Sequence, residues 1–276
     1  MLTLYRLWFQ IGSWLWPGFA ARQAFSLFIT PQTRYNKPLP PIFAQAETLE
    51  WTESGDRCQG WRWNKGGRIR ILILHGFSSS ARNFFHFVEA LTKLDVEVIA
   101  FDAPAHGNSE GKKIHSLRYR KLIQEIRSQW GPIDGYIAHS FGGLSLSLAL
   151  EEIPPRRSER VVLIAPATET RSALNQLQAT LQLRPNLMQR IDRLIEQRSS
   201  HSVSWFSVNR VVKQLSNPIL WVHDRSDEIT PLSDTEPTQS LSLPNVEFHL
   251  TEGLGHRRIY RDPVVCAEIV RFLTKQ

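Results

Sequence analysis

The chain has 276 residues, of which 42% are hydrophobic and 21% are charged, so it can bury a large core and is not expected to be disordered. Its net charge of +7 raises the question of nucleic acid, but the basic residues are scattered and lack interleaved aromatics, so no nucleic-acid partner is expected. Two cysteines, Cys58 and Cys266, are too few for a disulfide scaffold, although the sequence does not exclude one disulfide bond between them. They lack the spacing of metal ligands. The low cysteine content favours a reducing, cytoplasmic location.

The first 46 residues are compositionally unusual, because no acidic residue precedes Glu47. Four basic residues occur there: Arg6, Arg22, Arg34 and Lys37. Apolar side chains repeat at helical spacing at Leu4, Leu7, Trp8, Ile11 and Leu15. Pro17 and Gly18 are expected to end this pattern. Residues 1–46 are therefore predicted to form an N-terminal helical arm that packs on the main domain.

Other interpretations of the arm stay open at this point. An apolar run over residues 7–21 resembles the h-region of a signal peptide, although bulky tryptophans fit one poorly. Residues 1–30 could instead lie peripherally in a membrane interface, with Trp8, Trp14 and Trp16 at the level of the headgroups. A membrane-spanning helix is disfavoured, because polar and helix-breaking residues interrupt the run before the ~20 residues that a bilayer requires.

Beyond the arm, β-rich runs alternate with helical patterns. Two short runs over residues 48–52 and 58–63, joined by a Ser54-Gly55-Asp56 turn, predict an antiparallel edge of a sheet. Further strands are expected at 69–74, 96–101, 133–139, 160–165, 218–223 and 246–250. Helices are expected over 84–94, 114–130 and 263–273. This alternation predicts an α/β fold, with a mostly parallel sheet flanked by helices on both faces.

One segment interrupts the alternation. Between residues 168 and 215 no β-rich run occurs, and leucine and isoleucine repeat at helical spacing. The segment follows the carboxyl end of a strand, at the edge where open α/β sheets bind ligands. Residues 47–276 are therefore predicted to form one domain, with a small helical cap inserted at about 168–215. An ordinary crossover with an extra helix is the alternative.

Ser140 is the first candidate for chemistry, because it lies between small residues where a strand meets a helix. The run Ala138-His139-Ser140-Phe141-Gly142 is close to the G-x-S-x-G nucleophile elbow, in which flanking side chains must be small for the backbone to turn sharply. A helix that begins at Phe141 would direct its positive end toward an oxyanion beside Ser140. The motif alone does not separate this interpretation from an ordinary strand-to-helix turn.

A serine nucleophile needs a histidine base and a carboxylate that orients the histidine. Asp227 and His256 each follow a predicted strand, and with Ser140 they give the chain order Ser, Asp, His, which is the order of α/β-hydrolases. Asp224 is the rival for the carboxylate, and Asp227 is preferred. Four further polar residues are interpreted as structural: His75 and His139 in the core, Asp102 and His106 in a loop.

The chain resembles the α/β-hydrolase superfamily over residues 47–276. The resemblance rests on Leu74-His75-Gly76-Phe77, Asp102-Ala103-Pro104-Ala105-His106-Gly107-Asn108-Ser109, His139-Ser140-Phe141-Gly142-Gly143, His223-Asp224-Arg225-Ser226-Asp227 and Gly255-His256. It is nearest to bacterial serine hydrolases with a short helical cap. The resemblance implies that Ser140 is the nucleophile, His256 the general base and Asp227 the orienting acid. It also implies an oxyanion hole from the backbone N–H groups of Phe77 and Phe141, and no metal or cofactor.

The expected activity is hydrolysis of a carboxylic ester, or of a thioester or amide, through an acyl-enzyme formed on Ser140. The expected partner is a small-molecule acyl substrate, whose identity and chain length the sequence does not indicate; nor does it indicate the oligomeric state. Three alternatives stay open: acyl transfer on the same residues, hydrolysis of a carbon–carbon bond, and a non-catalytic membrane-associated scaffold.

Overall fold

The computed structural model describes residues 2–34, 38–154 and 158–275, so Lys37 of the predicted arm lies outside the described residues. Within these ranges the strands are β1 (Glu47–Glu53), β2 (Asp56–Trp63), β3 (Ile69–Leu74), β4 (Val96–Phe101), β5 (Gly135–His139), β6 (Arg160–Ile164), β7 (Ile219–Asp224) and β8 (Val246–Thr251). The α-helices in the same ranges are α1 (Leu2–Leu15), α2 (Pro17–Phe28), α3 (Phe85–Thr92), α4 (Ser116–Trp130), α5 (Phe141–Leu150), α6 (Thr170–Leu181), α7 (Pro185–Ser199), α8 (Val208–Val212), α9 (Glu236–Gln239), α10 (Gly255–Arg258) and α11 (Pro263–Thr274).

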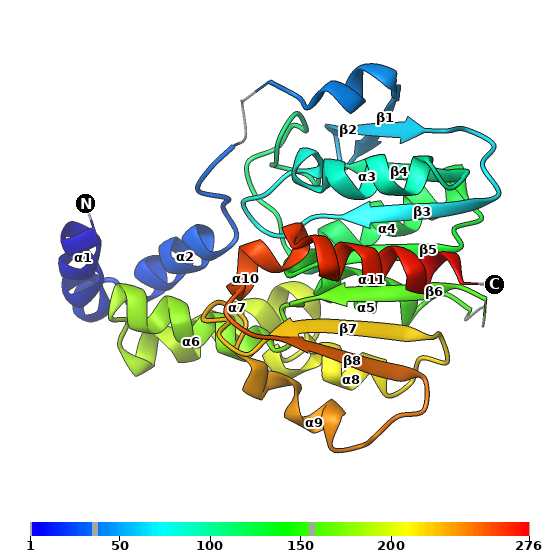
Figure 1. The fold of residues 1–276 in the computed structure, drawn as a ribbon. Helices are drawn as coiled ribbons and strands as arrows, with labels where there is room; N and C mark the ends of the chain where they lie inside the picture. Colours follow the sequence, from blue (N-terminus) through cyan, green and yellow to red (C-terminus); the bar gives the residue numbers. More distant parts are fainter. Residues whose placement is uncertain (1, 35–37, 155–157, 276) are drawn as a thin grey trace.

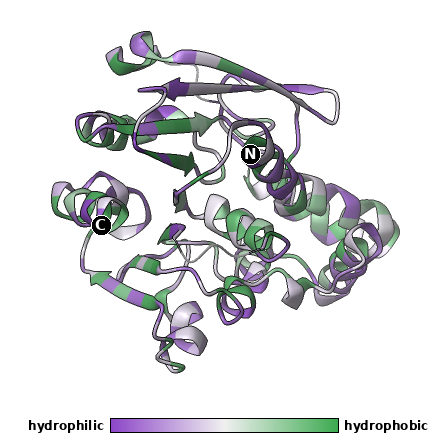
Figure 2. Ribbon diagram, turned by 90° about the vertical axis from the view of Figure 1, so that its right-hand side faces the viewer, coloured by the Kyte–Doolittle hydropathy of each residue, from purple (hydrophilic) through white to green (hydrophobic). Residues whose placement is uncertain are grey.

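In the described part of the chain, the strands form one sheet in the order β1-β2-β4-β3-β5-β6-β7-β8 (Figure 1). Strand β2 runs antiparallel to both β1 and β4, and the other neighbours are parallel. The predicted antiparallel edge and the predicted α/β class are both confirmed. The central strands are almost wholly hydrophobic in Figure 2, whereas the edge strands β1 and β8 mix hydrophilic and hydrophobic residues, as expected of strands with a solvated side.

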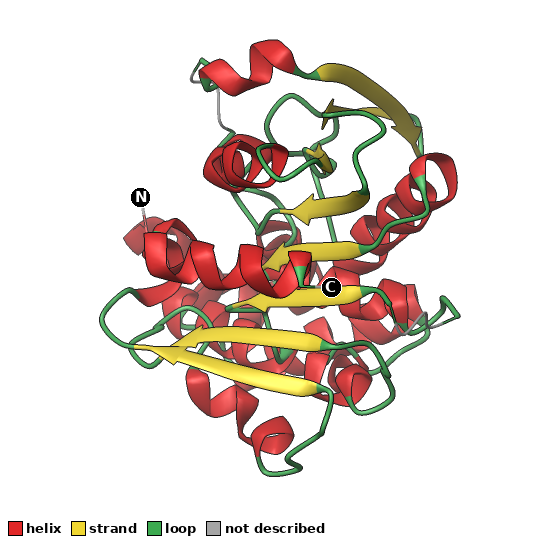
Figure 3. Ribbon diagram, turned by 45° about the vertical axis from the view of Figure 1, so that its right-hand side comes forward, coloured by secondary structure: helices red, strands yellow, loops and turns green. Residues whose placement is uncertain are grey.

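Helices cover both faces of the sheet (Figure 3). Because side chains alternate along a strand, Leu72 and Leu74 of β3 pack with the core that includes α4, α5 and α8, while Ile71 and Ile73 pack with α3 and α11. Parallel strands between two helical layers place all their carboxyl ends at one edge. That edge carries the loops after β3, β5, β7 and β8, where the candidate residues lie.

The first two helices lie at the same edge, beside α6 and α7 (Figure 1). Helix α1 ends at Leu15 as the sequence predicts, but α2 begins at once because proline suits the first position of a helix. The small inner face of α2 packs against α7, with Ala20, Ala21 and Ala24 fully buried. The helices of the arm therefore rest on the helices between residues 168 and 215, whereas Phe43, near the end of the arm, packs against Trp61 and Trp63 of β2.

The orientation of α1 is the reverse of what its apolar spacing suggests. Phe9, Gly12 and Ser13 form the buried face, whereas Leu4 and Leu7 are exposed. The helical repeat predicts the helix correctly, but most of the side chains that form the repeat face solvent. No helix among the described residues combines the length and the apolar content that spanning a bilayer would require.

Candidate active site

Ser140 lies on a sharp turn between β5 and α5. Its backbone has φ 52° and ψ −119°, a left-handed conformation that L residues rarely adopt and that marks stored strain. The turn is tight because α5 approaches β3 closely: a Cβ on Gly142 would lie 2.7 Å from the carbonyl oxygen of His75. Only glycine fits there, and the sharp turn presents the buried Ser140 hydroxyl to a cavity at the sheet edge.

His256, in the loop and short helix after β8, reaches this hydroxyl. Its Nε2 lies 3.0 Å from Ser140 Oγ, and its Nδ1 lies 2.8 Å from Asp227 Oδ2. Because a carboxylate only accepts, Nδ1 carries the proton when the imidazole is neutral, and Nε2 is free to accept from the hydroxyl. The structure thus brings together Ser140, His256 and Asp227, the three residues that the sequence analysis predicted as partners.

Asp227 is buried and held by several donors. The N–H groups of Ile229 and Thr230 donate to its Oδ1 at 2.8 and 2.9 Å, and the Thr230 hydroxyl donates to Oδ2 at 2.9 Å. Burial raises the pKa of Asp227, but the hydrogen bond and charge interaction with His256 and these N–H donors outweigh it and hold the pKa below its ordinary value. Asp227 is therefore charged across the physiological range.

Thr230 is a site residue that the sequence reasoning missed. Its Oγ1 also lies 3.2 Å from His256 Nδ1 and 3.3 Å from the Ala165 carbonyl, so it contacts both the carboxylate and the imidazole. The available signal was its position three residues after Asp227, where an Asp side chain commonly bonds the backbone that follows it.

Asp224, the rival carboxylate, has a different set of partners. It accepts from the Ser226 hydroxyl, the Thr251 hydroxyl at 2.6 Å and the Leu254 N–H at 3.0 Å, and so ties the loops after β7 and β8 together. Asp224 therefore connects these two segments, whereas Asp227 is the carboxylate that contacts His256.

Phe77, in the loop after β3, and Phe141, the first residue of α5, flank the hydroxyl, with ring centroids 5.7 Å apart in an edge-to-face contact. In the described part of the chain, their backbone N–H groups donate to no protein acceptor. The Phe77 loop is fixed by His106, whose Nε2 accepts from the Ser78 N–H at 2.9 Å, and by Asp102, which accepts from the Ser80 hydroxyl at 2.8 Å. Asp102 and His106 thus hold this loop in place.

The remaining histidines near the site are buried and neutral. His75 donates through Nδ1 to the Gly76 carbonyl and accepts at Nε2 from the Ala103 N–H, and burial lowers its pKa to about 4. His139 donates from Nε2 to the His256 carbonyl at 3.0 Å, and burial holds the pKa of His139 well below its ordinary value. His139 therefore supports the backbone of His256 without serving as a second base.

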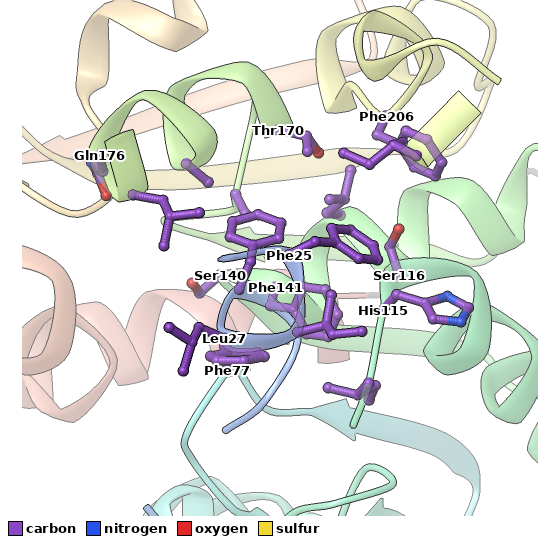
Figure 4. A pocket seen from close by; sticks show the side chains of 18 of the residues that line it. Phe25, Leu27, Phe77, His115, Ser116, Ser140, Phe141, Thr170, Gln176 and Phe206 are labelled. Carbon is purple, nitrogen blue, oxygen red and sulfur yellow. The ribbon is translucent and has the colours of Figure 1, made fainter. Parts of the chain in front are cut away.

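A cavity of about 750 Å³ opens beside Ser140. Its walls come from the arm (Phe25, Leu27), from α5 (Phe141, Leu144) and from the helices after β6 (Leu177, Leu181, Phe206). Figure 4 shows Ser140 near Phe77 and Leu27, with Phe25 and Phe141 in the middle and His115 farther along. The cavity is apolar, and it lies within the size range of sites for drug-sized ligands.

The sheet order, the strained elbow and the serine–histidine–aspartate geometry together define an α/β-hydrolase. Residues 67–215 match the model of the family described as serine aminopeptidase, S33, and the chain belongs to this family. The matched region contains Ser140, whereas Asp227 and His256 lie beyond it.

Individual relatives are more distant. The chain is 24% identical over 169 residues to monoglyceride lipase from Rattus norvegicus, covering 56% of each, and 31% identical over 103 residues to a putative esterase/lipase from Mycoplasma pneumoniae, covering 37% of this chain and 38% of that protein. The chain thus spans about half the length, or less, of these curated relatives. A solved esterase from Pyrococcus furiosus superposes with a TM-score of 0.65 at 20% identity, over 90% of this chain and 98% of that one, which shows a common fold.

Proposed function

We propose that this protein is a serine hydrolase that cleaves carboxylic esters with an apolar acyl group. The observation that carries the proposal is the continuous contact from Asp227 through His256 to Ser140, at 2.8 and 3.0 Å, at the wall of an apolar cavity. Ser140 is the proposed nucleophile, His256 the general base and Asp227 the residue that orients and stabilises the imidazolium.

In the proposed reaction, Ser140 Oγ attacks the ester carbonyl carbon while His256 Nε2 takes the hydroxyl proton. The carbonyl oxygen becomes an oxyanion that accepts hydrogen bonds from the N–H groups of Phe77 and Phe141. The alcohol leaves with the proton returned by His256. Water, deprotonated by the same nitrogen, then attacks the acyl-enzyme, and the carboxylic acid departs as Ser140 regains its proton.

The composition of the cavity favours esters over peptides, although the matched family carries an aminopeptidase name. An aminopeptidase has to bind the ammonium group of its substrate, for which a carboxylate is the natural partner. Of the described residues that line the cavity, none is aspartate or glutamate, and Arg198 is cationic. An uncharged acyl chain suits these walls better than a free amino terminus does.

Two measurements test the proposal. A fluorophosphonate probe should label the wild type and the Ser147→Ala variant, which changes another buried serine of α5, but not Ser140→Ala. Hydrolysis of p-nitrophenyl esters should increase from acetate to longer acyl chains, and should exceed hydrolysis of alanine p-nitroanilide. Labelling that persists in Ser140→Ala would reject Ser140 as nucleophile, and preference for the anilide would reject an ester substrate.

A further inference from the structure

Helix α1 exposes most of its apolar side chains, with Phe9 buried, and makes polar contacts on its inner side. Five residues at helical spacing form what we call the arm face: Leu4 (71% exposed), Leu7 (58%), Ile11 (45%), Trp14 (72%) and Leu15 (60%). On the inner side, Arg6 Nε donates to the Thr180 carbonyl at 2.9 Å and Gln10 Nε2 donates to the Gln182 carbonyl at 2.7 Å. These polar contacts with the end of α6 hold the helix so that its apolar stripe faces outward. Contiguous apolar surface of this kind marks an interaction site.

From this arrangement we infer that the arm face docks on a lipid bilayer that contains anionic headgroups. The arm has no acidic residue before Glu47, while Arg22 is exposed on α2 and the Arg184 guanidinium stacks over the Trp14 ring at 4.9 Å. An apolar stripe with tryptophan, bordered by arginine, matches the acyl region and the negative surface of such a bilayer. A second copy of the chain would bring the same positive charges together and is the less favourable occupant.

Helix α1 carries the arm face, and α1 and α2 together contribute to the cavity wall. Leu2 and Tyr5 of α1 and Phe25 and Phe28 of α2 line the cavity, whereas the arm face lies on the outer side of α1. A docked bilayer would therefore hold its acyl chains next to helices that form the cavity wall. This inference goes beyond the proposed hydrolysis and does not depend on it, because docking uses none of the residues proposed for chemistry.

Flotation of the full-length protein with vesicles tests the inference. The wild type should float with vesicles of phosphatidylcholine and phosphatidylglycerol in equal parts, and less with phosphatidylcholine alone. About 1 M salt, where the Debye length is ~3 Å, should reduce the difference between the two. The double variant Leu7→Gln/Ile11→Gln keeps the net charge and should lower the partition coefficient about tenfold or more, because two apolar side chains are lost from the interface.

The matched control replaces two leucines that lie outside the arm and are exposed to a similar degree as Leu7 and Ile11. Leu94 and Leu241 are each 47% exposed, and Leu94→Gln/Leu241→Gln should float as the wild type does. Equal flotation of the two double variants, or absence of wild-type flotation with anionic vesicles, would overturn the inference. A dimer in sedimentation that the arm-face variant abolishes, without vesicle binding, would assign the face to a second copy and also overturn it.

Two further measurements separate docking from catalysis. The Ser140→Ala variant should float as the wild type does, and the arm-face variant should hydrolyse a soluble short-chain p-nitrophenyl ester at the wild-type rate. Failure of the ester assay in the wild type would count against the proposed function alone.

Discussion

In most proteins charged groups are exposed and apolar groups are buried. The sheet edge at Ser140 and the N-terminal arm differ from this distribution in opposite ways. At the sheet edge, Asp227 is buried with a full set of donors. In the arm, the leucines and a tryptophan of α1 face solvent. A buried charge and an exposed apolar stripe each cost stability unless something compensates the cost. The contrast teaches that both proposals for this molecule rest on places where the hydrophobic pattern is broken.

The sharpest test of this contrast compares the two buried carboxylates after β7. Asp227→Asn should lower kcat about 10⁴-fold, because an amide no longer selects the imidazole tautomer or stabilises the imidazolium. Asp224→Asn should lower kcat far less, since its partners lie at the end of β8 and in the adjoining loops and do not include His256. Steady-state hydrolysis of a p-nitrophenyl ester measures both. Equal losses would mean that burial alone, rather than contact with His256, determines the effect.

The two faces of α1 provide the second test. Phe9→Ala removes a buried ring, which typically costs about 3 kcal/mol, so the amides of α1 should exchange with deuterium roughly a hundredfold faster. Leu7→Ala on the outer face should leave the exchange rates of α1 nearly unchanged. Similar acceleration in both variants would show that the outer face contributes to packing after all.

The buried neutral histidines provide a third test through pH. Burial lowers the pKa of His75 to about 4 and that of His106 to about 3, against an ordinary value of about 6.5. Because protonation is disfavoured in the folded state, the contribution of these histidines to stability is complete above pH ~6.5. It is lost as the pH falls toward their folded-state pKa values, by about 1.4 kcal/mol for each unit by which a pKa is lowered. Chemical denaturation as a function of pH should show this loss. His75→Gln should flatten the dependence, and His249→Gln, at a partly exposed position, should not.

Thr230 is expected to show the smallest effect. Thr230→Val keeps the shape and removes the hydroxyl that contacts Asp227 and His256, so kcat should fall about tenfold while KM stays the same. Thr230→Ser should restore most of the rate, as expected of a positioning residue. A change confined to KM would assign Thr230 to the cavity wall instead.

The sequence predicted the strands and their mostly parallel arrangement well, because apolar runs separated by helical repeats allow few arrangements. Its residue spacing also identified Ser140, Asp227 and His256, which the structure places in contact, although their catalytic roles stay proposals. Thr230 escaped because a single threonine in a loop has no periodic signal. Periodicity likewise predicted α1 as a helix without indicating what its apolar stripe faces: the similar stripe of α4, with Leu122 and Ile126, is buried.

Part of the cavity wall and the residues proposed for chemistry come from different segments of the chain. Phe25, Leu27 and Phe28 precede every strand of the sheet, whereas the residues proposed for chemistry follow β5, β7 and β8. Recombination between the segments that encode α2 and β1 would exchange this part of the cavity wall as a unit and leave the residues proposed for chemistry unchanged. Chimaeras that carry the first helices of a relative should therefore change the preferred acyl length while retaining the same labelled serine.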